Sequence, residues 1–301
     1  MQGKTNTTKA GTLESSAPSE NLASPLNTPH TEASPPHTPS KHALSDMSPF
    51  ASHCFKGKRF VVTGASSGMG AHIALTLNAL GAEILALGRD RERLESKRAK
   101  AQYKEGFIPI VKDISDFNGL DKYALNLAKE YGSFNGAVLS AGLQQTAPIS
   151  SVLSVESART IFDVNYFGNL QILKGLLDKR AQSAEGASFV WISSNASVKA
   201  QRGIANYSAS KAAVVAATRT IALEIAPKYR INAISPGFVL TEMIEKWSKV
   251  YDSKYIESMD KAYPLGVGAV EDISPLVCFL LSPASAWITG QNIIIDGGGS
   301  L

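Results

Sequence analysis

Short apolar runs alternate with longer amphipathic stretches from about residue 55 to the C-terminus. Each run holds four to six residues, mostly aliphatic or aromatic, and the stretches between the runs carry apolar residues at helical spacing. Such runs are typical of strands buried on both faces of a parallel sheet. The expected strands are 59–63, 83–87, 107–111, 136–139, 188–193, 230–235 and 292–296. Because parallel crossovers are right-handed, this alternation predicts an α/β fold with a doubly wound, seven-stranded parallel sheet between two helical layers.

Residues 1–54 lack this pattern. They hold seven of the 14 prolines and four of the five histidines, and they are rich in Ser and Thr. A segment of this composition does not bury enough apolar surface to offset its chain entropy. We therefore predict a disordered tail over 1–54 and a single domain over 55–301. The Ser-Pro and Thr-Pro pairs of the tail would suit modification or docking, but a linker is the simpler interpretation.

Composition narrows the classes of partner. The net charge is +4, and no run of Lys and Arg is longer than two residues, so a nucleic-acid partner is not expected. No stretch of about 18 apolar residues and no apolar leader occur, so we expect neither a membrane span nor a secretory signal. Cys54 and Cys278 are far apart and have no metal-ligand spacing. These features predict a cytoplasmic protein without a metal site.

A glycine-rich motif, Gly-x-x-x-Gly-x-Gly, joins the first expected strand to the first expected helix. Glycines let the backbone approach a pyrophosphate, and a helix N-terminus offers unpaired N–H groups and the positive end of its dipole. The strand-turn-helix context favours a dinucleotide-binding turn over a purely structural one. The expected contacts in this motif come from Gly64, Ser66, Ser67, Gly68, Met69 and Gly70.

The end of the second strand bears on the choice of cofactor. Sites that prefer NAD place an acid there for the ribose 2′-hydroxyl, but Gly88 holds that position here. Arg89 follows and suits a 2′-phosphate, so NADP(H) is favoured over NAD(H), which stays open. Asp90 would serve the ribose or cap the next helix. Asp113, just past the third strand, would meet the adenine or hold a turn.

Candidate chemistry lies in the second half of the chain. Tyr207 and Lys211 form a Tyr-x-x-x-Lys pair, which on a helix shares one face. A neighbouring ammonium stabilises a phenolate and so lowers a tyrosine pKa toward the range useful for acid–base work. Ser194 ends an expected strand, where its hydroxyl could bind a substrate carbonyl. Asn165 is a polar residue in an apolar helical stretch, where it would either hold a water beside Lys211 or be a satisfied core amide.

Together these motifs resemble the single-domain branch of the short-chain dehydrogenase/reductase family over about residues 56–301. The resemblance rests on the motif at 63–70, the segments 235–241 and 288–298, and Asp113, Asn165, Ser194, Tyr207 and Lys211. It implies a Rossmann-type, three-layer αβα domain. The implied catalytic tetrad is Asn165, Ser194, Tyr207 and Lys211, with Tyr207 and Lys211 also contacting the cofactor. Further implied cofactor contacts are Ile114, Ala141, Gly142, Pro236, Gly237, Val239 and Thr241.

Two positions depart from the family pattern. Ser140 stands where Asn is usual after the fourth strand, and Val267 stands where Arg is usual. The usual Asn ties neighbouring strands together, so we expect Ser140 to hold its turn less firmly. The residues that would choose the substrate are expected in 242–263, as an amphipathic lid or as ordinary surface helices.

The resemblance implies an NADP(H)-dependent oxidoreductase acting on a small-molecule carbonyl or secondary alcohol. The pattern is similar to 3-oxoacyl-ACP reductases, so a carrier-bound 3-oxoacyl thioester is one candidate substrate. Lys179, Arg180, Lys228 and Arg230 would attract an acidic carrier, although solvated surface charge is the simpler interpretation. An NAD(H)-dependent sugar, steroid or small-alcohol dehydrogenase and a catalytically silent regulator remain alternatives. By the same resemblance, helices in 157–180 and 207–227 would form the interface of a homotetramer or homodimer.

Overall fold

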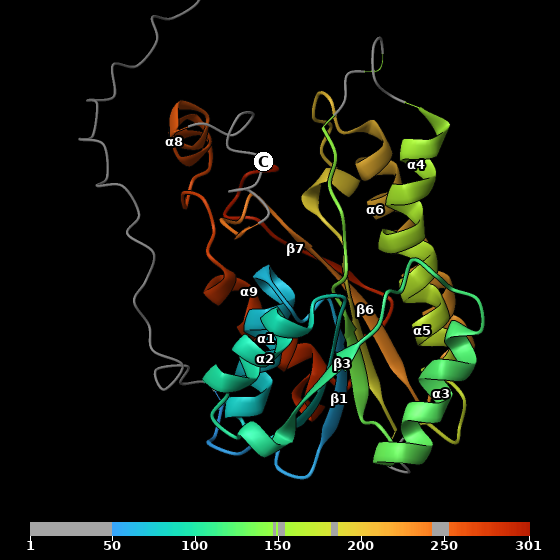
Figure 1. Ribbon diagram of the computed structural model, residues 1–301. Coiled ribbons are helices and arrows are strands. Elements are labelled where there is room, and N and C mark those ends of the chain that lie inside the picture. Colours follow the sequence, from blue (N-terminus) through green and yellow to red (C-terminus); the bar gives the residue numbers. More distant parts are fainter. Residues whose placement is uncertain (1–49, 147–148, 150–153, 182–185, 243–252) are drawn as a thin grey trace, which may run out of the picture. The chain divides into compact units, whose positions relative to one another are not determined.

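A computed structural model describes residues 50–146, 149, 154–181, 186–242 and 253–301. Seven parallel strands form one sheet in the order β3-β2-β1-β4-β5-β6-β7 (Figure 1). The strands are β1 Arg59–Thr63, β2 Glu83–Gly88, β3 Phe107–Val111, β4 Gly136–Leu139, β5 Ser188–Ile192, β6 Arg230–Pro236 and β7 Asn292–Ile295. The predicted α/β fold with a seven-stranded parallel sheet is confirmed, and the ends of four strands differ by one residue from the sequence prediction.

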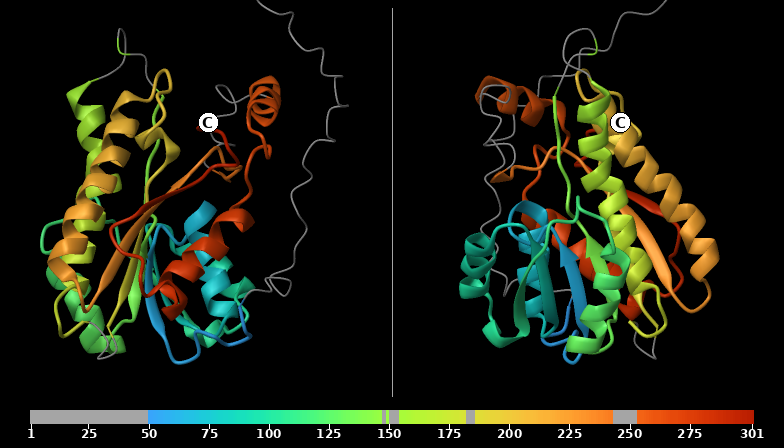
Figure 2. Two further views of the ribbon diagram at one scale, coloured as in Figure 1. Left: turned by 180° about the vertical axis from the view of Figure 1, so that it is seen from behind. Right: turned by 45° about the vertical axis from the view of Figure 1, so that its right-hand side comes forward.

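Helices cover both faces of the sheet, as a doubly wound fold requires. The described helices are α1 Gly68–Ala79, α2 Arg91–Lys100, α3 Leu120–Tyr131, α4 Val155–Phe162, α5 Asn169–Leu176, α6 Ala205–Ile225, α8 Ser253–Ala262 and α9 Val270–Leu281. Shorter turns are η2 Lys104–Gly106, the π-helical η3 Asp163–Gly168, η4 Asn195–Ser197 and η5 Pro283–Ser285. Helices α1, α2 and α9 lie on one side of the sheet, and α3 to α6 lie on the other (Figures 1 and 2).

Alternate side chains of the strands enter two separate cores. In β5, Val190 and Ile192 pack toward α1 and α9, whereas Phe189 and Trp191 pack toward α3, α5 and α6. Because successive side chains point to opposite faces, a strand that is apolar at every position must be covered twice. This explains the continuous apolar runs in the sequence, and it gives the three-layer αβα arrangement.

The chain reverses its direction of travel across the sheet between β1 and β4. From β1 it adds β2 and β3 to one side, and it then crosses to place β4 to β7 on the other side. In open parallel sheets, ligands bind outside the carboxyl ends of the strands at such a switch point. We therefore expect a ligand site among the segments that follow β1, β4 and β5.

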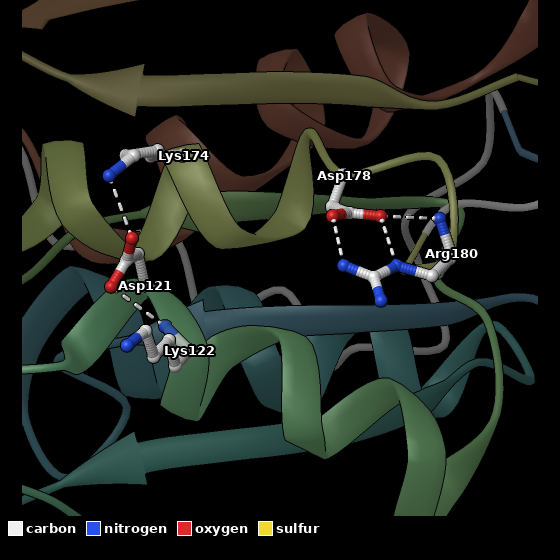
Figure 3. Close-up of polar contacts among 5 residues, drawn as sticks. All are labelled: Asp121, Lys122, Lys174, Asp178 and Arg180. Carbon is white, nitrogen blue, oxygen red and sulfur yellow. Dashed lines mark hydrogen bonds and ion pairs between the residues drawn. The ribbon is translucent and has the colours of Figure 1, made fainter.

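Helices α3 and α5 pack closely because Gly175 has no side chain. A Cβ there would lie 2.2 Å from the carbonyl oxygen of Asp121 and 2.7 Å from Cβ of Ala124. Figure 3 shows the polar rim of this contact, where Lys174 Nζ of α5 lies 2.7 Å from Asp121 Oδ2 of α3. Exposed ion pairs of this kind contribute little, so close packing is the main interaction that joins the two helices.

The domain boundary at residue 54 stays a prediction, because residues 1–49 lie outside the described residues. All described residues belong to one compact unit. Phe55 is buried in the core beneath α1, and Phe50 packs against the same core. No helix in the described part of the chain is long and apolar enough to cross a bilayer.

Candidate functional site

A cavity opens at the carboxyl ends of the strands, where the order of the sheet reverses. Its wall runs from the turn after β1, past the ends of β2 to β5, to the start of α6 and the segment after β6. It brings together Gly64, Ser66, Ser67, Gly68, Met69, Gly70, Arg89, Asp113, Ile114, Ala141, Gly142, Ser194, Tyr207, Lys211, Gly237, Val239 and Thr241. Of the implied tetrad and cofactor contacts, Asn165 and Pro236 do not line it.

The glycine-rich turn forms a close-fitting cradle. Gly64 has a φ of +69°, and a Cβ there would lie 2.8 Å from Cα of Ala141. A Cβ on Gly70 would lie 2.5 Å from the carbonyl oxygen of Gly64. Ser67 precedes α1 without a side-chain capping hydrogen bond, so the first N–H groups of the helix are not satisfied by its cap. A turn of this shape at a helix N-terminus fits the pyrophosphate of a dinucleotide.

Thr63 and Asn169 hold the turn after β4 against the turn after β1. Thr63 Oγ1 accepts hydrogen bonds from the backbone N–H groups of Ser140 and Ala141, both at 3.0 Å. The same hydroxyl donates to Asn169 Oδ1 at 2.7 Å, and Asn169 Nδ2 donates to the carbonyl oxygen of Ala141 at 2.9 Å. The side chains of Thr63 and Asn169 thus tie the end of β1 to the turn that contains Ser140. These hydrogen bonds explain how the turn is held without the usual Asn.

Cationic side chains mark the end of the cavity beside β2 and β3. Arg89 is exposed, with Nη1 3.8 Å from Asp113 Oδ2, and the neighbouring Lys112 also lines the cavity. Asp90 Oδ1 accepts from the backbone N–H of Arg93 at 3.0 Å. Of the two roles left open for Asp90, the structure shows the helix cap.

Asp113 holds a tight turn after β3. Its Oδ1 accepts from the backbone N–H of Ser115 at 2.9 Å and from the Ser115 hydroxyl at 2.7 Å. Burial acts to raise the pKa of Asp113, but these two hydrogen bonds and the charges of Arg89 and Lys112 together hold it below its usual value. The turn role considered for Asp113 is therefore present, and its contact with an adenine stays a prediction.

Lys211 and Tyr207 lie on one face of α6, as their spacing predicted. Lys211 is 4% exposed, and its Nζ donates to the carbonyl oxygen of Ile192 at 2.9 Å. The ammonium lies 5.7 Å from the centre of the Tyr207 ring. Burial lowers the pKa of Lys211 to about 8, because desolvation disfavours its charged form. The site therefore holds a cation that titrates close to neutrality beside a phenol.

The end of β5 is fastened to the same helix. Ser193 Oγ donates to the backbone carbonyl oxygen of Lys211 at 2.8 Å. Ser194 follows in extended conformation, and its Oγ accepts from the backbone N–H of Ala196 at 3.2 Å at the start of η4. The bonds of Ser193 and Lys211 fix the distance between strand and helix, so they also position Ser194 on the cavity wall.

Asn165 lies behind the cavity wall, within the π-helical turn η3. It is fully buried, its Oδ1 accepts from the backbone N–H of Leu143 at 2.6 Å, and its Nδ2 donates to the Leu143 carbonyl oxygen at 2.9 Å and to Ser210 Oγ at 3.0 Å. Both N–H donors of its amide are thus used within the protein. This agrees with the satisfied core amide considered from the sequence, and the contact with a water beside Lys211 stays a prediction.

Sequence reasoning missed part of the cavity wall. The additional polar lining residues are Lys112, Gln144, Ser193, Asn195, Gln201 and Tyr263. Asn195 could have been found from the sequence, because it directly follows the candidate residue Ser194. Tyr263 had none beyond its place at the end of the expected substrate segment, of which 243–252 lie outside the described residues. Across the described residues, no group of three or more His, Cys, Asp or Glu side chains could hold a metal ion.

Comparison with known proteins shows which family the chain resembles. Residues 64–300 match the family model described as enoyl-(acyl carrier protein) reductase. The 3-oxoacyl-[acyl-carrier-protein] reductase of Thermotoga maritima is 31% identical over 246 residues, which cover 81% of this chain and 98% of that protein. The D-erythrulose reductase of Gallus gallus is 32% identical over 247 residues, covering 81% of this chain and 96% of that protein.

A solved structure with a similar sequence identity has the same fold. The glucose/ribitol short-chain dehydrogenase/reductase from Brucella melitensis matches with a TM-score of 0.76 and 29% identity, covering 83% of this chain and 100% of that one. The chain belongs to the short-chain dehydrogenase/reductase family. It is an NAD(P)-dependent oxidoreductase that acts on CH–OH or C=O groups.

The hydrogen bonds of Thr63 predict a difference between two buried threonines. Thr63→Val removes the acceptor of two N–H groups and the donor to Asn169, so we expect a loss of about 1–3 kcal/mol in unfolding free energy and weaker NAD(P)H binding. Thr76 is the matched control, because its Oγ1 is buried with no hydrogen-bond partner among the described residues. Thr76→Val should leave stability equal or higher. Urea unfolding followed by circular dichroism measures both, and equal losses would contradict the role given to Thr63.

Proposed function

We propose that this chain is an NADP(H)-dependent carbonyl reductase in which Tyr207 donates the proton. The observation that carries the proposal is the buried Lys211 ammonium beside the Tyr207 ring, on a cavity that Ser194 and the glycine-rich turn also line. A binding regulator without catalysis would not need a buried cation next to a phenol. Tyr207 and Lys211 are titratable groups on one face of α6, and a positioned acid of this kind is what proton transfer to a reacting oxygen uses.

The residues of the site divide the reaction among them. A bound nicotinamide supplies the hydride for the carbonyl carbon. Ser194 Oγ holds the carbonyl oxygen as negative charge develops on it, and the Tyr207 hydroxyl gives that oxygen its proton. The Lys211 ammonium stabilises the phenolate that Tyr207 becomes, which lowers the cost of releasing the proton. Asn165 holds Leu143 and Ser210, so it positions the cavity wall on one side and α6 on the other.

Preference for NADP(H) is supported at the end of the cavity beside β2. Arg89 and Lys112 both line it, and no acid occupies the position of Gly88. A Cβ on Gly88 would lie 3.1 Å from Cβ of Ser66, so the Ser66 side chain lies against this end of β2. Two cations and a hydroxyl suit a 2′-phosphate better than a 2′-hydroxyl.

Two of the four cations considered for a carrier protein, Arg180 and Arg230, have partners within the chain. Arg230 is half-buried and donates to the carbonyl oxygens of Leu280, Ser282 and Ile288. Arg180 pairs with Asp178, with Nη2 2.7 Å from Oδ2 (Figure 3). Both guanidinium groups are thus engaged within the chain. A 3-oxoacyl thioester remains a candidate substrate because of the resemblance to the Thermotoga maritima reductase, and a hydroxyketone because of the resemblance to the erythrulose reductase.

Exposed apolar side chains on two helices bear on the assembly of the enzyme. We propose a cytoplasmic homotetramer or homodimer that associates through α4, α5 and α6. Val155 of α4 and Leu223 of α6 are exposed apolar side chains on these elements, 61% and 84% accessible, which a partner subunit would cover. Analytical ultracentrifugation gives the assembly state directly.

The role of Tyr207 is tested by Tyr207→Phe, which removes the proton donor and keeps the ring. We expect carbonyl reduction to fall by about 10²–10⁴-fold, because proton transfer is lost, while the affinity for NADPH stays within a few-fold. Stopped-flow NADPH oxidation and NADPH fluorescence titration measure the two quantities. Tyr103→Phe, outside the cavity, is the matched control and should behave as wild type. Full turnover in Tyr207→Phe would contradict the assignment of Tyr207 as the proton donor.

Arg89→Ala tests the cofactor preference. Loss of a charge-assisted bond to a 2′-phosphate should raise KM for NADPH about 10- to 100-fold and leave KM for NADH nearly unchanged. Arg91→Ala is the matched control, because Arg91 is exposed, lies two residues further along and does not line the cavity. The idea is wrong if both cofactors respond equally to Arg89→Ala, or if the wild type uses NADH as well as NADPH.

A further inference from the structure

Asn195 directly follows Ser194 and lines the cavity wall. Its side-chain amide is held by two residues from the C-terminal part of the chain, Tyr263 and Asp296. Asn195 Nδ2 lies 3.4 Å from Tyr263 Oη and 3.3 Å from Asp296 Oδ2, in donor position to both. A carboxylate only accepts hydrogen bonds, so the NH₂ group of the amide must face Asp296. The carbonyl oxygen Oδ1 is therefore the acceptor side of this amide.

This arrangement depends on glycines that leave room for it. Tyr263 is 7% exposed, and a Cβ on Gly299 would lie 2.2 Å from its ring atom Cε1. A Cβ on Gly237 would lie 2.6 Å from Cβ of Asp296. Asp296 Oδ1 also accepts from the backbone N–H of Gly298 at 3.1 Å. Neighbours on several sides thus fix the orientation of Asn195 before any substrate arrives.

Beyond the segments after β2 and β3, the cavity wall carries neutral polar side chains among apolar ones. Gln144 and Gln201 line it together with Asn195 and Tyr263. Apart from Lys211, the charged lining residues in the described part of the chain are Arg89, Lys112 and Asp113, which belong to the segments after β2 and β3. The carboxylate of Asp296 stands behind Asn195, and the Lys199 ammonium nearby is held by the carbonyl oxygen of Gly299. The wall therefore favours an uncharged substrate over a carboxylate or phosphate.

We propose that Asn195, oriented by Tyr263 and Asp296, binds a hydroxyl group on the carbon next to the reacting carbonyl. The substrate class is then a small uncharged hydroxyketone. The inference rests on the proposed function, in which Ser194 holds the carbonyl oxygen. Ser194 and Asn195 are consecutive residues that both line the cavity, so the substrate groups that they bind are taken to be neighbours on its carbon chain.

The orientation of the Asn195 amide favours hydroxyketones over acyl thioesters as substrates. In the proposed contact, Asn195 Oδ1 accepts a hydrogen bond, which a hydroxyl can donate, whereas the thioester and the carbon chain of a 3-oxoacyl group have no donor. Tyr263 Oη, which accepts from Asn195, keeps its own proton to donate to a second hydroxyl of the substrate. A site built to bind a hydroxyl rejects the analogue that lacks it, because its polar groups are then left unpaired.

The test compares three neutral carbonyl compounds by NADPH oxidation: 2-butanone, 1-hydroxy-2-butanone, and the N-acetylcysteamine thioester of acetoacetate. They are assayed with the wild type, with Asn195→Leu, which keeps the approximate volume, and with Tyr263→Phe, which keeps the ring. Gln102→Ala is the matched control, an exposed amide outside the cavity. NADPH fluorescence titration establishes that each variant is folded.

We expect the wild type to prefer 1-hydroxy-2-butanone over 2-butanone by at least about tenfold in kcat/KM. Asn195→Leu should reduce that preference by about three- to tenfold, mainly through KM, and Tyr263→Phe should reduce it in the same direction. Gln102→Ala should keep it. If Asn195→Leu does not bind NADPH, the change of preference in Tyr263→Phe decides.

Two results overturn the inference and leave the proposed function intact. One is a wild type that reduces the thioester or 2-butanone as well as the hydroxyketone. The other is a preference that Asn195→Leu, or Tyr263→Phe in its place, leaves unchanged. Failure of the proposed function looks different, because the wild type would then bind NADPH without oxidising it in the presence of any of the three compounds.

Discussion

The site depends on the burial of one ammonium group. Lys211 is 4% exposed, and its Nζ donates to the carbonyl oxygen of Ile192. Holding a cation out of water is costly, so it persists only where the surrounding backbone is fixed. Here the fixing bond runs from Ser193 to the backbone of Lys211, which joins the end of β5 to α6. The same bonds that keep the ammonium in place therefore set Ser194 and Tyr207 on one wall.

A second set of bonds keeps the two halves of the cavity in register. Thr63 and Asn169 tie the turn after β1 to the turn after β4, and Asn165 ties Leu143 to α6 through Ser210. Thr63, Asn169 and Asn165 are fully buried, and none of them lines the cavity. In the proposed reaction, their hydrogen bonds hold the dinucleotide end of the cavity in a fixed position relative to Tyr207, so that hydride donor and proton donor meet at one carbon–oxygen bond.

The strands of the sheet and the pairing of Tyr207 with Lys211 could be predicted from the sequence, because they depend on local or periodic patterns of residues. The seven strands follow from continuous apolar runs, and the pairing of Tyr207 with Lys211 follows from helical spacing. The bonds of Thr63 to the Ser140 turn and the contact of Asn195 with Tyr263 could not be predicted. They join residues 77 and 68 positions apart, and no periodic pattern encodes such a pairing. Asp90 shows a third case, where the sequence left two roles open and the helix cap is present.

The pH dependence of carbonyl reduction tests the central claim most directly. Burial lowers the pKa of Lys211 to about 8, so the side chain is charged below that pH and neutral above it. Since the proposed mechanism uses the charged form, kcat/KM for the carbonyl at saturating NADPH should fall as the pH rises through about 8. Lys211→Arg should move this fall to higher pH, because a guanidinium stays charged. A profile that is flat to pH 9.5, or a fall that Lys211→Arg leaves in place, would contradict the account.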